Sequence, residues 1–305
     1  MAGTVESTSH RVAAPALATT YEGMSSDLFN QILPLIDYLE VAPDSIARTV
    51  NGYTNLRPEL LEQLASATPY TELLVHGIGL SIGSADSWNE SYLRLLDEFF
   101  NRFTPRWHSE HLGCTTVNGE NLGTMLALPR TEEMLDLLCE RVLILQHRYR
   151  VPFLVEHIIH LLPDAPAEYT PAGFLNALTA RTGCGLILDA YNLECDAHNF
   201  GFDIPLFLDE LNLDPVREMH LAGGYEHHGF QLDIHSRPTA DSTIALAHEI
   251  LARCPNLEII TWEILKEAVP ALGTSAICAE LTRIQTEFTK VQAEAGTIPA
   301  ELASC

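Results

Sequence analysis

Residues 185–192 read GLILDAYN, a short apolar run that ends on Asp189 and is followed by Asn192. Six other short runs also end on a histidine or a carboxylate, namely 36–40 (IDYLE), 73–76 (LLVH), 107–111 (WHSEH), 153–156 (FLVE), 216–220 (VREMH) and 258–263 (EIITWE). Packing alone does not explain this repetition, because a buried histidine, aspartate or glutamate costs several kcal/mol unless it is paired or bound to a metal. The repetition predicts a metalloenzyme whose ligands lie at the ends of strands.

These runs belong to an alternation of β-type and helix-type segments, which is typical of βα units around a parallel sheet. We expect strands at 16–21, 36–41, 73–77, 107–112, 153–158, 185–190, 216–221 and 258–263, and helices at 26–35, 58–67, 90–102, 131–149, 171–182, 205–211, 241–252 and 275–295. Such a series predicts an α/β fold, a (β/α)8 TIM barrel with its site at the carboxyl ends of the strands. An open doubly wound sheet is the alternative, because the first strand has the weakest pattern.

The domain organisation follows from length and composition. Hydrophobic residues make up 47% of the 305 residues, and the mean hydropathy is +0.06, so the chain can bury a large core. We expect one barrel domain over residues 15–305, including the C-terminal helix, and a disordered tail over the small, polar residues 1–14. Residues 222–257 form a long connection rich in histidine and aspartate, where function is expected.

The charge and the cysteines limit the partners and the compartment. Lysine and arginine total 17 against 41 acidic residues, which gives a formal charge of −24. This charge argues against nucleic acid and anionic membranes as partners and favours a basic peptide or protein. The seven cysteines form no C-x-x-C pair, and no signal peptide or long apolar span is seen. We therefore expect a reduced, cytoplasmic protein.

The candidate ligands are histidines and carboxylates without any cysteine. Asp233 and His235 are spaced i, i+2, so in an extended segment both side chains point to the same side. Asp189 could equally cap the following helix. Nitrogen and oxygen donors suit borderline metals, and the set is too large for one ion, so two or three ions are expected. The chain has no H-E-x-x-H, G-x-G-x-x-G, P-loop or G-x-S-x-G motif, which removes support for zincins, dinucleotide enzymes, P-loop proteins and serine hydrolases.

Other polar residues near the expected mouth are candidates for contacts with the ligands or the substrate. They are Glu40, His157, His198, His227, His228 and Arg237. Five more histidines lie in tails, helices or loops, where we expect neither a partner nor a role: His10, His108, His147, His160 and His248.

The order of the motifs resembles one family, the multinuclear non-heme iron-dependent oxidative enzymes, over about residues 36–265. The motifs are HGIGLSIGSAD, SEHL, T-E-E-x-L-D, the glutamate of FLVEH, RTGCGLILDAYN, N-F-G-F-D, REMHLAG, D-I-H-x-R-P and the glutamate of ITWE. The resemblance implies a TIM barrel that holds two or three irons in a mixed Fe(II)/Fe(III) state, with O2 as co-substrate. The ligands it implies are His76, His111, Glu156, Asp189, Asn192, His220, Asp233, His235 and Glu263.

The chain departs from the family pattern at three places. Glu156-His157 stands where the family has Glu-Asn, ALATTYEG replaces a G-I-G-L-R sequence, and a glutamate-histidine stretch after the second strand is reduced to LEVAPDS. These departures argue against assigning a relative's product to this chain.

The resemblance also implies a reaction and its partners. Family members oxidise a cysteine in a ribosomally made precursor peptide, often with a partner protein that binds the leader. The thiolate would bind iron, and hydrogen abstraction at the cysteine Cβ would begin the oxidation. Two alternatives stay open: a non-redox barrel enzyme of the sugar isomerase or phosphodiesterase type, and a protein that holds metal without turnover.

Overall fold

The computed structural model describes residues 14–163 and 167–295 and confirms the closed barrel. Its parallel strands follow one another around the barrel in the order β1, β2, β5, β6, β9, β10, β11 and β14. Their bounds are Ala16–Tyr21, Tyr38–Val41, Glu72–Gly77, His108–His111, Phe153–Glu156, Gly185–Asp189, Val216–Leu221 and Ile259–Trp262. Strand β1 pairs with both β2 and β14, which excludes the open sheet. The tail expected at 1–14 lies outside the described residues except for its last residue.

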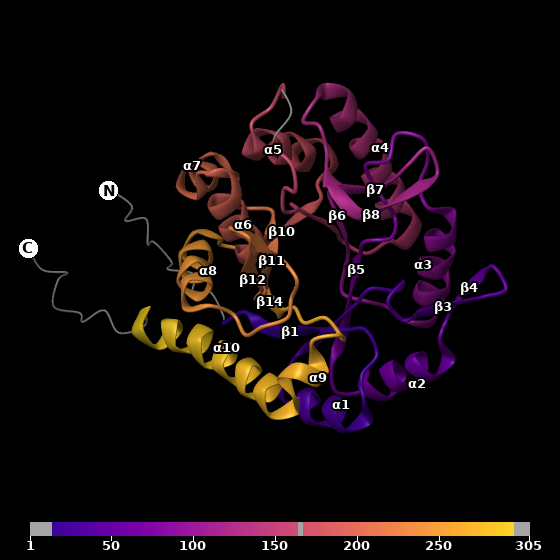
Figure 1. Cartoon of the computed structure of the whole chain (residues 1–305), viewed down its shortest axis with the longest axis vertical. Coiled ribbons are helices and arrows are strands. Elements are labelled where there is room, and N and C mark those ends of the chain that lie inside the picture. Colours follow the sequence, from indigo (N-terminus) through magenta and orange to yellow (C-terminus); the bar gives the residue numbers. More distant parts are fainter. Residues whose placement is uncertain (1–13, 164–166, 296–305) are drawn as a thin grey trace, which may run out of the picture.

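Helices surround the barrel strands (Figure 1). They are α1 (Ser26–Ile32), η1 (Leu33–Leu35), α2 (Pro58–Ala67), α3 (Glu90–Arg102), α4 (Glu132–Tyr149), α5 (Pro171–Thr182), α6 (Ala190–Phe200), α7 (Ile204–Glu210), α8 (Asp241–Arg253), α9 (Val269–Leu272) and α10 (Thr274–Ala295). Helix α6 was not predicted from the sequence. It begins directly after β10, where the Asp189 side chain accepts hydrogen bonds from the backbone of Tyr191 and Asn192. None of the described helices combines the length and the apolar character needed to span a membrane.

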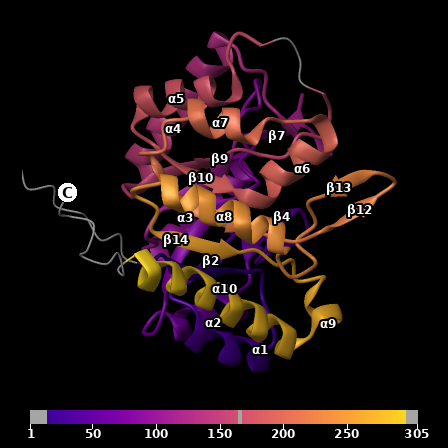
Figure 2. The same ribbon diagram turned by 90° about the vertical axis from the view of Figure 1, so that its left-hand side faces the viewer.

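Three β-hairpins follow the carboxyl ends of β2, β6 and β11, in segments where no strand is expected from the sequence. They are β3–β4 (Ala47–Val50 and Tyr53–Leu56), β7–β8 (Gly113–Val117 and Glu120–Ala127) and β12–β13 (Tyr225–His227 and Phe230–Leu232). Each has a turn with two consecutive residues of positive φ, at 51–52, 118–119 and 228–229. Such turns match the twist of a hairpin, and Asn-Gly, found in the first two, is a strong signal for them. Figure 2 shows β12–β13 projecting beyond the barrel.

An apolar layer closes the interior of the barrel at the amino ends of the strands. Its buried side chains come from β1, β5, β9, β10 and β14 and from the residue before β6, and they pack in one cluster separate from the main core: Ala18, Leu74, Trp107, Leu154, Ile187 and Ile259. The larger core fills the space between the strands and the surrounding helices. Because side chains alternate along a strand, the residue two positions after each of these residues also faces the interior. This apolar layer, which we call the floor of the barrel, therefore separates the next layer of interior side chains from solvent at the amino ends of the strands.

Candidate metal centre

The strand alternation places the predicted ligands in the barrel interior. His76, Glu156 and Asp189 each stand two residues after a floor residue, at Leu74, Leu154 and Ile187. His220 and Glu263 reach the same layer from β11 and from the end of β14. All five are buried, with at most 5% of their surface exposed. The carboxyl ends of the strands thus bring together side chains that are far apart in the sequence.

Glu156 is the centre of the first group. Its Oε2 lies 2.8 Å from Nε2 of His76 and 3.3 Å from Nε2 of His111, and these two nitrogens are 3.3 Å apart. Its Oε1 lies 3.6 Å from Nδ1 of His220. Ligand atoms of His76, Glu156 and His220 all fall within 4.8 Å of one another, a spacing that one metal ion can bridge.

A second group lies beside the first. Nε2 of His235 is 2.7 Å from Oδ1 of Asp233 and 3.6 Å from Oε2 of Glu263. Glu263 also approaches the first group, because its Oε2 is 3.3 Å from Nδ1 of His220. Asp189, His235 and Glu263 offer ligand atoms within 4.8 Å of one another. Asp233 and His235 therefore do meet at one place, although the segment is not extended, because His235 has φ of 42°.

The hydrogen bonds of His76 and His111 leave one nitrogen of each ring facing Glu156. Nδ1 of His111 is 2.9 Å from the carbonyl of Gly77, which can only accept, so this nitrogen carries the proton. Nδ1 of His76 is 2.9 Å from the Ser109 hydroxyl, which itself donates to the carbonyl of Val75. Each Nε2 is thereby left as the ring nitrogen that faces Glu156, where it could bind a metal ion once it has given up any proton, and fixing a ring through its other nitrogen in this way is typical of metal-binding histidines.

Glu40 and Glu218 form a third group, on the Nε2 side of the His220 ring. Nε2 of His220 lies 3.3 Å from Oε2 of Glu40 and 3.5 Å from Oε1 of Glu218. Glu218 accepts hydrogen bonds from Nε1 of Trp107, at 2.9 Å, and from the Thr261 hydroxyl. The sequence interpretation missed Glu218. Its position two residues before His220 on the same strand was the available signal.

Burial and the dense charge shift the pKa values of these groups in opposite directions. Burial raises the pKa of Asp189 well above its usual range, and the charges of Asp233 and Glu263 act in the same direction. Burial also raises the pKa of Glu40, to about 7, against the influence of His220. For His220, burial lowers the pKa, but the carboxylates of Glu263, Glu40 and Glu156 outweigh it and raise the value well above normal. The metal-free protein therefore holds protons within the cluster near neutral pH.

The unpartnered polar atoms provide a test of whether metal ions fit here. Two buried oxygens of the cluster, Asp189 Oδ2 and Asn192 Oδ1, have neither a hydrogen bond nor an ion-pair partner, and the two nitrogens of His220 have no carboxylate oxygen nearer than 3.3 Å. Leaving such atoms unsatisfied in a dry interior costs about 1–3 kcal/mol each. A set of imidazole nitrogens and carboxylate oxygens without thiolates suits iron, manganese or zinc. The cluster therefore fits more than one cation of this class.

Of the six residues predicted to contact the ligands or the substrate, not all reach the cluster. Glu40 does, whereas the ring of His157 lies against Phe207, with ring centres 6.1 Å apart, and lines a cavity of about 70 Å³. The others lie on α6, on the β12–β13 hairpin or after it: His198 is 3.7 Å from Glu226, His227 and His228 are exposed at the turn, and Arg237 lies over the Tyr225 ring.

Two of the histidines expected to lack a partner have one. His108 lies within β6 and faces the helices, where its Nε2 is 3.0 Å from Oε1 of Glu110. Nδ1 of His160 is 2.6 Å from Oδ2 of Asp196. That expectation was wrong for these two, because strand alternation places His108 in the outer core and α6 brings Asp196 to the β9 loop. His10 lies outside the described residues.

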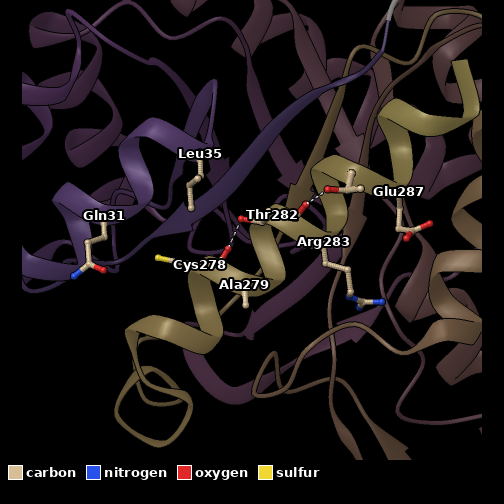
Figure 3. Close-up of a pocket in the computed structure, with 8 residues that line it drawn as sticks. Gln31, Leu35, Cys278, Ala279, Thr282, Arg283 and Glu287 are labelled. Atoms are coloured by element: carbon tan, nitrogen blue, oxygen red, sulfur yellow. Dashed lines mark hydrogen bonds between the residues drawn. The ribbon is translucent and has the colours of Figure 1, made fainter. Parts of the chain in front are cut away.

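A surface pocket of about 750 Å³ lies elsewhere. Figure 3 shows it between α1, η1 and α10, with Gln31, Leu35, Cys278 and Arg283 among its lining residues. None of the predicted site residues lines it. This pocket and the cluster of candidate ligands are therefore different places on the molecule.

The comparisons with known proteins agree with this geometry. Residues 22–288 match the family model described as RiPP precursor modification enzyme MbnB/TglH/ChrH. UPF0276 proteins of Caulobacter vibrioides and Acaryochloris marina are 34% and 33% identical, over 70% and 83% of this chain and 74% and 90% of theirs. A xylose isomerase domain-containing protein of Salmonella typhimurium matches 91% of this chain and 98% of its own, with TM-score 0.63 and 14% identity. At that identity, the structural match supports the barrel fold alone.

Proposed function

The chain belongs to the MbnB/TglH/ChrH family of RiPP precursor modification enzymes, which act on ribosomally made peptides, and from this premise we propose that it oxidises a peptide cysteine with iron and O2. The observation that carries the proposal is the convergence of two imidazole nitrogens, Nε2 of His76 and Nε2 of His111, on one oxygen of Glu156. A partner protein that binds the leader of the precursor is part of the proposal, as is a substrate that presents its cysteine at the barrel mouth.

The proposed ligands of two or three irons are the nine residues that the family resemblance implied. They are His76, His111, Glu156, Asp189, Asn192, His220, Asp233, His235 and Glu263. When bound, the irons would supply an open position for the cysteine thiolate and the redox chemistry with O2 that removes hydrogen from its Cβ. The protein contributes the geometry of the ligands, the apolar floor that excludes water and a net negative charge that attracts a cationic peptide.

Glu40 and Glu218 have a separate proposed role. Both carboxylates face Nε2 of His220, so a proton on that nitrogen is stabilised and Nδ1 is left free toward Glu156 and Glu263. This arrangement of carboxylate, imidazole and metal fixes the ring and raises the basicity of the ligand. Glu40 and Glu218 would then orient His220 without binding the metal themselves.

Metal binding is expected to release protons and to strengthen as the pH rises. Asp189, His220 and His235 have raised pKa values in the metal-free protein, so near neutral pH they bind protons that a metal ion must displace. Between about pH 6 and pH 8, the affinity for Fe(II) should therefore increase. Calorimetry in buffers of different ionisation enthalpy measures the released protons. An affinity that does not change over this range would contradict the assignment of these three groups as ligands.

The proposed function is tested by anaerobic reconstitution with Fe(II), followed by addition of O2 and a leader-bearing peptide with its leader-binding partner. We expect the peptide to change mass, free cysteine to be a poor substrate, and a peptide with the target cysteine replaced by serine to stay unchanged. A mass change on the serine peptide would contradict thiolate binding. Activity with zinc or manganese alone, and none with iron, would favour a non-redox barrel enzyme.

A further inference from the structure

We propose that Asn199 and Tyr191 on helix α6 are positioning residues that hold Asp233 and His235 at the metal centre. The inference rests on the proposed function, since it treats Asp233 and His235 as ligands. These two residues are unlike the strand ligands, because they belong to no barrel strand. They follow the β12–β13 hairpin directly, so their place depends on what holds that hairpin against the barrel.

Asn199 binds the outer edge of the hairpin through both atoms of its amide. Its Nδ2 donates to the carbonyl of Gln231 at 2.9 Å, and its Oδ1 accepts from the backbone N–H of Gln231 at 2.7 Å. Gln231 stands opposite Glu226 in the hairpin, one residue from the turn-closing pair, where the N–H and C=O groups point outward from the ladder. Asn199 therefore satisfies both groups as a third strand would.

Tyr191 binds Leu232, the residue after Gln231, and the Gln231 side chain. Its hydroxyl donates to the carbonyl of Leu232 at 3.2 Å and accepts from Nε2 of Gln231 at 2.6 Å. Gly224 makes this contact possible, because a Cβ at that position would lie 2.0 Å from the Leu232 carbonyl oxygen and 2.6 Å from the Tyr191 hydroxyl. Leu232 immediately precedes Asp233, so the backbone is held one residue before the first proposed loop ligand.

The other side of the segment is also held, and the backbone between the two anchors is strained. The N–H of Ser236 donates to the carbonyl of Gly223 at 2.8 Å, and the carbonyl of His235 accepts from Leu265 at 3.1 Å. His235 has φ of 42°, a left-handed conformation that residues with side chains rarely adopt. A strained residue at a functional site persists only when its surroundings hold it there.

Helix α6 links the two sets of ligands. It begins directly after its N-cap Asp189, the last residue of β10, carries Asn192 in its first turn and reaches the hairpin through Tyr191 and Asn199. One helix therefore sets the distance between the proposed ligands on strand and helix and those on the loop. This also explains the N-F-G-F-D motif: Asn199 binds the hairpin, Gly201 ends α6 with φ of 71°, and Asp203 caps α7.

The experiment compares Asn199→Ala with Asn176→Ala as a matched control. Asn176 on α5 makes the same kind of double contact with backbone, since its Nδ2 donates to Glu210 and its Oδ1 accepts from Asn212. That contact lies at the connection leading into β11, at the amino end of the strand. Circular dichroism and thermal melting establish that both variants fold, and Asp233→Ala serves as the variant that lacks a proposed loop ligand.

Two measurements test the inference: anaerobic Fe(II) titration, and amide hydrogen exchange of residues 225–237 in the metal-free protein. We expect Asn199→Ala to bind its weakest iron about 10–100-fold less tightly, with faster exchange in the hairpin and recovery of full iron content at saturating Fe(II). Asp233→Ala should not recover, and Asn176→Ala should behave as the wild type. Tyr191→Phe should show a smaller effect than Asn199→Ala.

Wild-type iron affinity and wild-type exchange in Asn199→Ala would overturn the positioning role while leaving the iron barrel intact. Failure of the wild-type protein itself to bind iron would instead contradict the proposed function. In that case, the positioning role would also be overturned if the amide hydrogen exchange of the hairpin were the same in Asn199→Ala as in the wild type. A role limited to positioning would likewise be contradicted if Asn199→Ala, at saturating Fe(II), bound no more iron than Asp233→Ala does.

Discussion

Replacing Glu156 by glutamine is expected to lower turnover by more than about 100-fold, because loss of a partner outside the ligand shell already costs 10–100-fold in metal affinity or activity. One oxygen of Glu156 lies within 3.3 Å of Nε2 of both His76 and His111, and the other approaches His220. The amide keeps the volume of the carboxylate but removes its charge and offers N–H donors where metal ions need acceptors. Iron per chain after anaerobic reconstitution and turnover of the precursor peptide both measure the effect.

Glu226→Gln is the matched control, because it makes the same chemical change on the exposed β12–β13 hairpin. It should keep the wild-type iron content. Near-normal iron and turnover in Glu156→Gln would show that Glu156 is not the central ligand and would remove the main support for the proposed function.

Replacing Asp233 or His235 by alanine is expected to abolish turnover and leave the fold largely unchanged. Both side chains lie on a loop at the barrel mouth and contribute no side chain to the described apolar core, so the melting temperature of the metal-free protein should change little. They approach each other at 2.7 Å, and His235 also approaches Glu263, so each deletion removes a donor from the same group.

Peptide turnover, iron content and thermal melting together test this second prediction. Arg237→Ala, two residues further along, is the control for iron content and melting, because its guanidinium group lies over the Tyr225 ring. Full iron content and near-normal activity in either Asp233→Ala or His235→Ala would show that the D-I-H pair is not a ligand pair.

The two predictions differ in what they test. Glu156 is held by the hydrogen-bonded ladder of the barrel, between β6 and β10. Asp233 and His235 depend on a hairpin of three-residue strands that is held by side chains of α6. A change near α6 should therefore affect the second group of ligands and spare the first, whereas a change in the strands affects both.

Much of the fold was readable from the sequence because the strand signal is local. A strand of a parallel barrel is an apolar run of four to six residues, and helices of ten or more residues separate most of these runs. All eight barrel strands lie where the alternation predicted them, including the weak first strand. The hairpins were missed although Asn51-Gly52 and Asn118-Gly119 signal their turns, because the flanking strands are too polar and exposed to show a clear pattern.

The sequence by itself determined which residue types stand at the carboxyl ends of the strands, and hence the barrel, the family and the prediction that the chemistry takes place at the mouth. Only the tertiary structure decided which of these residues meet. Alternation sends His76 and His220 inward but His108 and His157 away from the axis, and helix α6 places the Asp233–His235 segment beside Glu263. The physical reason is that strand period and apolar character are properties of neighbouring residues, whereas distances between ligands depend on barrel closure and on contacts such as Asn199 with Gln231, which join distant parts of the chain.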